Sequence, residues 1–149
     1  MKKAFLFLSL FIAFSASVFA QKQIEPQIQR DPILEADASH NLEVARQYFT
    51  TKKAYKAVLM RFEETYAAYP DFSKMDEFLY YAAMSSVYLS QNKGKQKIDA
   101  KSETEKIKYA PEKLRDDAIG YFSAIVDKFP QSPYKAEAEK MLTELQAKK

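Results

Sequence analysis

Hydrophobic residues recur every three or four positions along five stretches of the chain, which is the spacing of one buried face of an α-helix. The first stretch opens with Asp31, a residue type that caps helices, and Pro32, which is favoured at a first helical position. Its inward positions are predicted to be Leu34, Ala38, Leu42, Ala45 and Phe49. The polar run 50–53 then ends this first helix.

A second helix is predicted over residues 54–69, and Pro70 ends it because proline disfavours helical geometry at the preceding residue. Its inward positions are Tyr55, Val58, Leu59, Phe62, Tyr66 and Tyr69. Ser73 is predicted to cap a third helix, with Asp76 completing a capping box. The third helix is apolar around most of its circumference, so we expect it to lie between neighbouring helices.

Residues 91–110 have a different character, with six lysines, three acidic residues and few large apolar side chains. We predict a lysine-rich, solvated loop inserted into the helical domain, with room for a short helix. Its positive charge leaves open a contact with an acidic partner or with an anionic membrane surface.

The periodic pattern resumes in two further helices. The fourth begins at Pro111 and stops before Pro130, with Leu114, Ala118, Ile119, Phe122, Ile125, Val126 and Phe129 inward. Ser132 and Pro133 start the fifth, with Tyr134, Ala138, Met141, Leu142 and Leu145 inward.

The second and fourth helices repeat one another at an offset of sixty residues. The matched pairs are Leu59 with Ile119, Phe62 with Phe122, Tyr66 with Val126, Tyr69 with Phe129, Pro70 with Pro130, and Glu77 with Glu137. In both copies an aromatic residue and a proline end one helix before a short polar link and the next helix. A single hairpin cannot bury its apolar face, so the repeat predicts an all-α stack of about five antiparallel helices.

These segments resemble tetratricopeptide repeats of the BamD (YfiO-type) outer-membrane assembly lipoproteins. The matching positions are Ala45, Tyr48, Ala57, Phe62, Tyr69 and Pro70, and in the second copy Ala118, Phe122, Phe129 and Pro130. The resemblance covers roughly residues 40–149 and implies a tetratricopeptide-like domain of two and a half hairpins over residues 31–149. It also implies a role in outer-membrane protein assembly. The chain differs from that family in having no cysteine for a lipid anchor and fewer repeats.

The first twenty residues have the layout of a cleavable secretory signal peptide. Lys2 and Lys3 precede the apolar run 4–14, and small residues lead to Ala20. A membrane anchor is the alternative, but the apolar run is shorter than the ~20 residues that a spanning helix needs. We expect a periplasmic protein without a direct membrane anchor after cleavage, associated with the outer membrane through a partner if at all. Residues 21–30 are expected to form a flexible leader.

Composition excludes most catalytic chemistry. The chain has no cysteine, one histidine (His40) and two glycines, so thiol nucleophiles, zinc-thiolate sites and glycine-rich phosphate loops are not expected. We therefore expect no enzyme activity, no catalytic residues, no cofactor and no metal site. Loss of the signal peptide lowers the net charge from +3 to +1, which gives no support for nucleic-acid binding.

The remaining expectation is a binding surface. On a stack of hairpins, the first helix of each pair lines one face, which places Arg46, Phe49, Tyr80, Met84 and Tyr88 together as candidate partner-binding residues. An envelope protein or peptide is the expected partner. One alternative is a small-ligand or cell-wall glycan-binding module that uses exposed tyrosine rings. Another is that these side chains belong to the core.

Overall fold

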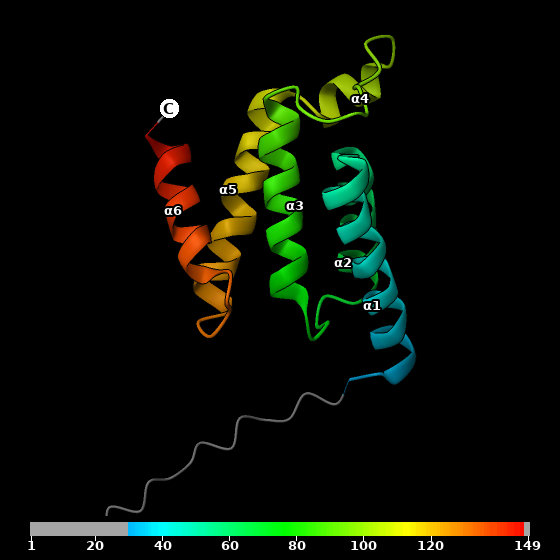
Figure 1. Ribbon diagram of the computed structural model, residues 1–149, viewed down its shortest axis with the longest axis vertical. Helices are drawn as coiled ribbons and strands as arrows, with labels where there is room; N and C mark the ends of the chain where they lie inside the picture. Colours follow the sequence, from blue (N-terminus) through cyan, green and yellow to red (C-terminus); the bar gives the residue numbers. More distant parts are fainter. Residues whose placement is uncertain (1–29, 148–149) are drawn as a thin grey trace, which may run out of the picture.

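The computed structural model describes residues 30–147, and within that range the chain is all-helical with no strand (Figure 1). The elements are α1 (Pro32–Gln47), the π-helical turn η1 (Tyr48–Lys52), α2 (Tyr55–Ala68), α3 (Met75–Ser90), α4 (Glu103–Lys108), α5 (Pro111–Lys128) and α6 (Lys135–Gln146). This confirms the predicted all-α fold. The expected signal peptide and residues 21–29 of the expected leader lie outside the described residues. No helix within the described range is long and apolar enough to cross a membrane.

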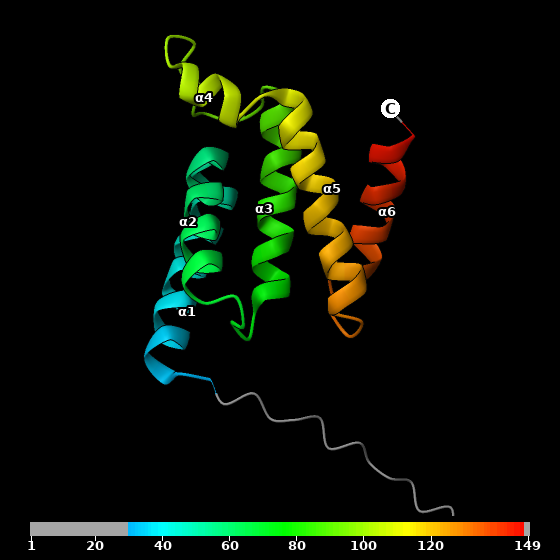
Figure 2. The ribbon, with the colours of Figure 1, turned by 180° about the vertical axis from the view of Figure 1, so that it is seen from behind.

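The long helices form two rows. In Figure 1, α1, α3 and α6 lie toward the viewer with α2 and α5 behind them, and Figure 2 shows α2 and α5 from the other side. Helix α3 packs against both α2 and α5, and ten of its residues are buried. The prediction that the most apolar helix lies between neighbours is therefore confirmed.

The sixty-residue repeat is also a repeat of the backbone. The corner between α2 and α3 is closed by hydrogen bonds from the amides of Tyr69, Phe72, Met75 and Phe78 to the carbonyls of Thr65, Tyr69, Phe72 and Lys74. The corner between α5 and α6 is closed by the equivalent bonds from Phe129, Ser132, Lys135 and Ala138 to Ile125, Phe129, Ser132 and Tyr134. Both corners place a proline directly after the C-cap residue of the helix, Pro70 after Tyr69 and Pro130 after Phe129.

One predicted cap is right and another is wrong. The Asp31 carboxylate accepts hydrogen bonds from the amides of Ile33 (2.8 Å) and Leu34 (3.3 Å), as expected for an N-cap. The capping box at Ser73 does not form, because α3 begins two residues later and Asp76 is engaged elsewhere. Its carboxylate accepts a hydrogen bond from the Ser132 hydroxyl at 2.6 Å, which ties the two corners together.

The core follows the predicted stripes with two exceptions. Phe62 and Phe122 are almost fully buried, whereas Leu34 is 38% exposed and Tyr66 is 45% exposed. Leu34 lies in the first turn of α1, which is the first helix of the described stack and so has neighbours on one side only. Tyr66 stacks on Phe62 at 5.4 Å between ring centroids and leaves its outer edge in solvent.

The lysine-rich segment is not wholly solvated. It crosses the N-terminal end of α2, where the Gln96 side chain accepts a hydrogen bond from the Ala57 amide at 3.0 Å. Glu105, in the short helix α4, pairs with Lys56 at 2.9 Å, and Tyr109 is buried. The segment thus gives the Ala57 amide, which also donates to the Ala54 carbonyl, a second acceptor, and it pairs the Lys56 cation in the first turn of α2.

Candidate functional site

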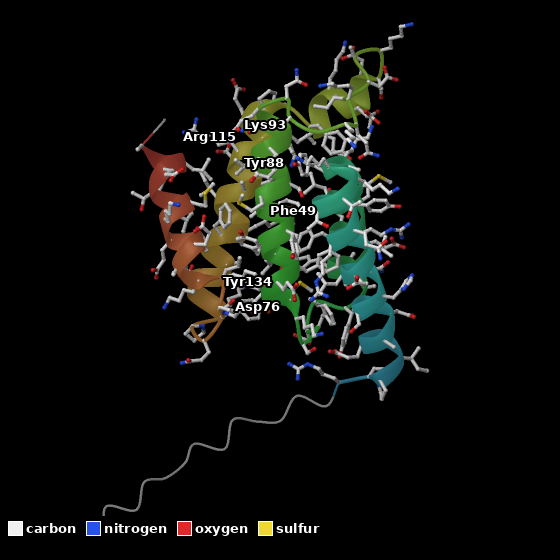
Figure 3. All side chains as sticks on the ribbon, in the orientation of Figure 1. Phe49, Asp76, Tyr88, Lys93, Arg115 and Tyr134 are labelled. Carbon is white, nitrogen blue, oxygen red and sulfur yellow. The ribbon has the colours of Figure 1, made fainter. Side chains whose placement is uncertain are left out.

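The candidate partner-binding residues lie on the row formed by α1, α3 and α6, which faces the viewer in Figure 3. We call this surface the aromatic face. It comprises Arg46, Phe49, Glu77, Tyr80, Tyr81, Tyr88 and Tyr134. Helix α3 supplies several of these residues because positions 77, 80, 81, 84 and 88 fall on one side of an α-helix.

An ion pair joins α1 to α3 at the centre of this face. The Arg46 guanidinium donates from Nε to Glu77 Oε1 and from Nη2 to Glu77 Oε2, both at 2.6 Å. A third bond runs from Nη1 to Glu43 at 2.9 Å. The hydrogen bonds with Glu77 are the main reason that the pKa of Arg46 is raised. Arg46 is thus held by carboxylates of its own chain.

A cluster of four rings occupies the part of the face near η1. Phe49 contacts the rings of Tyr55, Tyr81 and Tyr88 at centroid distances of 5.5, 5.1 and 5.8 Å. Tyr55 and Tyr88 are themselves 5.0 Å apart. These are normal distances for stabilising aromatic pairs. The π-helical turn carries Phe49 into this cluster directly after α1 ends.

A second aromatic contact joins α3 to the corner before α6. Tyr80 and Tyr134 stack with centroids 4.7 Å apart and ring planes 24° from parallel. Burial, followed by the negative charge of Glu77, raises the pKa of Tyr134 to about 12. Burial is also the first cause of the raised pKa of Tyr80 and of Tyr81. The hydroxyls of Tyr80, Tyr81 and Tyr134 are therefore neutral donors and acceptors at ordinary pH.

Four of the five residues predicted from sequence remain partly accessible. Arg46, Phe49, Tyr80 and Tyr88 are half-buried, so each packs within the stack and still presents part of its surface. Met84 is 9% exposed and belongs chiefly to the core. The sequence left open whether these side chains belong to the core or to a binding surface. In the structure, their inner edges pack in the core and their outer edges remain accessible.

Sequence reasoning did not place Glu77, Tyr81 and Tyr134 among the candidate binding residues. Tyr81 lies seven residues before Tyr88, so helical spacing alone could have placed it on the same face. Glu77 lies four residues before Tyr81 and could have been placed on the face by the same spacing. Tyr134 reaches the face through packing between helices, which periodicity within one helix does not reveal. His40 is exposed on α1. Within residues 30–147 no group of three potential ligands could hold a metal ion.

The chain was compared with known proteins at three levels. No family model, no curated protein and no solved structure matches it.

Proposed function

We propose that this protein is a non-catalytic periplasmic adaptor that binds a protein or peptide partner on its aromatic face. The single observation that carries the proposal is the gathering of five half-buried aromatic side chains from η1, α3 and the corner before α6 on one side of the stack. They are Phe49, Tyr80, Tyr81, Tyr88 and Tyr134. Periplasmic location rests on the signal-like residues 1–20.

The chemistry of these side chains suits a polypeptide partner. A tyrosine ring offers a large apolar contact area and a hydroxyl that can bond a backbone amide or carbonyl. Tyrosine is for this reason enriched among the residues that contribute most to protein interfaces. The rings also lose little conformational freedom on binding, because each is already packed against another ring.

The scaffold under the face is held in place before any partner arrives. Arg46 and Glu77 fix α1 against α3, and the Ser132–Asp76 hydrogen bond fixes the corner of α6 against α3. A surface organised in advance avoids the cost of ordering it during binding. The resemblance of the sequence over residues 40–149 to the BamD-type family extends the proposal to an envelope partner in outer-membrane protein assembly.

Site-specific photo-crosslinking in the intact envelope tests this proposal. A photoreactive amino acid replaces Tyr80 or Tyr88 on the aromatic face, and the matched control replaces Tyr66, an exposed tyrosine of α2 outside the aromatic face. We expect covalent protein adducts from the first two positions and not from the third. Adducts of equal yield at Tyr66, or none at any position, would contradict the proposal.

A titration with glycans distinguishes the adaptor function from the glycan-binding function that the sequence leaves open. Soluble cell-wall fragments are added to the purified protein while tyrosine fluorescence is followed. We expect no saturable change, because the tyrosines of the face are packed against one another. Saturable binding that is lost in Tyr80→Ala, without protein adducts at that position, would favour the glycan-binding function instead.

A further inference from the structure

Six lysines gather at one end of the molecule, beyond the aromatic face. They are Lys52, Lys53, Lys93, Lys95, Lys97 and Lys101, and we call them the basic end. Figure 1 shows this end at the top, where α3 finishes and α4 projects. Figure 3 labels Lys93 there, just above Tyr88.

Two tight turns bring Lys52, Lys53, Lys93 and Lys95 together. Lys53 closes η1 with a left-handed backbone (φ 50°), and Asn92 ends α3 in the same way (φ 56°). The Lys95 amide then donates to the Lys53 carbonyl at 2.9 Å, so the two turns lie side by side. Gly94, with φ 98°, permits this contact because its backbone passes directly over Tyr55 and Lys53.

The positive charge of the basic end lacks ion-pair partners. Within residues 30–147, no carboxylate lies within ion-pair distance of any of the six lysines. The three acidic residues of the lysine-rich segment 91–110 bond to other groups. Glu105 pairs with Lys56, Glu103 pairs with Lys106, and Asp99 accepts a bond from the Lys101 amide. Adjacent like charges without counter-charges favour an external anion.

The opposite end of the stack has the opposite charge. Around the start of α1 and the two corners, carboxylates outnumber cations. Among residues 30–147, the carboxylates there are Asp31, Glu35, Asp71, Asp76, Glu77, Asp127 and Glu137, and the cations are Arg30, Lys74, Lys128 and Lys135. A molecule polarised along its helix axes turns its basic end toward an anionic surface. The aromatic face runs along the helices and so stays free in that orientation.

We propose that the basic end docks on the surface of an anionic lipid bilayer. Its lysines are exposed and spread over two turns and a loop, which suits a broad, diffuse negative surface. The same end carries Ile107 on α4, which is 71% exposed and can enter the interfacial region of lipid. This attachment adds to the proposed adaptor role and needs no spanning helix.

Vesicle binding by the full chain tests the proposal. The probes are phosphatidylcholine vesicles and vesicles that also contain phosphatidylglycerol, and binding is followed by co-flotation. We expect binding only to the anionic vesicles, with loss of binding as salt rises from about 0.05 M to about 0.5 M. Every variant carries the same residues 1–20, so binding through that segment is common to the parent and the variants and cannot produce a difference between them.

Matched double variants assign the binding to the basic end. Lys52→Gln with Lys95→Gln should weaken binding to anionic vesicles by about 10-fold or more. Lys74→Gln with Lys128→Gln, which removes two exposed lysines from the opposite end, should leave it unchanged. Equal weakening by both pairs, or by neither, would overturn the proposal.

A third arm separates lipid from an acidic protein. Ile107→Gln should weaken vesicle binding severalfold and leave any binding of soluble polyglutamate unchanged, because only a bilayer takes up the apolar side chain. Polyglutamate that competes fully with vesicles at equal charge concentration, together with no effect of Ile107→Gln, would overturn the membrane assignment in favour of an acidic polypeptide. Photo-crosslinking at Tyr80 reports the adaptor function separately from all of these results.

Discussion

Arg46 on α1 and Glu77 on α3 form a two-point ion pair in which both nitrogen–oxygen distances are 2.6 Å. The pair spans 31 residues of sequence, and the Glu77 side chain is only 13% exposed. It is thus the polar link that holds the first helix of the stack against the central one.

A double-mutant cycle should measure this link directly. Arg46→Met and Glu77→Gln are expected to show a coupling free energy of about 1–2 kcal/mol in urea unfolding, because the pair is bidentate and partly buried. The control pair Arg61 and Glu64 is more exposed, so its coupling should stay below about 0.5 kcal/mol. Equal couplings would mean that Arg46 and Glu77 do not organise the face.

The two phenylalanines at equivalent positions of the repeat should contribute similarly to the free energy of unfolding. Phe62→Ala and Phe122→Ala should each lower the free energy of unfolding by about 3–5 kcal/mol, because both rings are almost fully buried. Lys97→Ala, an exposed change, should stay within about 0.5 kcal/mol of the parent. Unaltered thermal unfolding in both phenylalanine variants would contradict the helical register.

The two glycines should respond to alanine in opposite directions. A Cβ at Gly94 would lie 2.7 Å from Tyr55 Cδ2 and 2.8 Å from the Lys53 carbonyl, at a backbone φ of 98°. Gly94→Ala should therefore cost about 1–3 kcal/mol. Gly120 lies inside α5 with nothing near its Cβ position, so Gly120→Ala should stabilise by about 0.5–1 kcal/mol. Chemical denaturation of the two variants gives both values.

Alkaline pH should destabilise the fold through its tyrosines. Burial raises the pKa of Tyr121 and of Tyr134 from the ordinary value of 10 to about 12. Their contribution is fully present below pH 10, where both states bind the proton, and it falls as pH rises toward 12, because the unfolded chain ionises first. The urea midpoint should drop over this range. Tyr121→Phe with Tyr134→Phe should make the drop less steep, and an unchanged slope would count against these shifts.

Replacement of two serines by alanine should change stability differently, because only one of the two hydroxyls has a hydrogen-bond partner. Ser86 is fully buried on α3, and within the described residues its hydroxyl has no hydrogen-bond partner. Ser86→Ala should leave stability unchanged or raise it by up to about 1 kcal/mol. Ser132 donates to the Asp76 carboxylate, so Ser132→Ala should cost about 1–2 kcal/mol. Thermal unfolding that ranks the variants in the reverse order would contradict both assignments.

The helices could be predicted because their signals are local. Pro32 and Pro111 mark the starts of α1 and α5, and Pro70 and Pro130 follow the ends of α2 and α5. The π-helical turn was not predicted because it depends on hydrogen bonds between residues five apart, such as that from the Lys53 amide to the Tyr48 carbonyl, which have no sequence signature.

The site could be predicted only in part, for the same physical reason. Helical spacing placed Tyr80 and Tyr88 on one face, but it could not identify Glu77 as the partner of Arg46. Nor could composition show that Gln96 would bond the first turn of α2 from 39 residues away. Contacts between distant segments depend on how the helices pack, and the periodic pattern within one helix does not determine that packing.

The two corners of the stack show how one backbone shape can serve two purposes. At equivalent positions, Phe72 and Ser132 make the same amide bond, to Tyr69 and Phe129 respectively. Phe72 sends its ring into the interior, whereas Ser132 reaches across to Asp76. Because the backbone hydrogen bonds hold the shape of each corner, the side chains of the two copies are free to differ. One copy therefore contributes a core side chain, and the other contributes a hydrogen bond that links neighbouring hairpins.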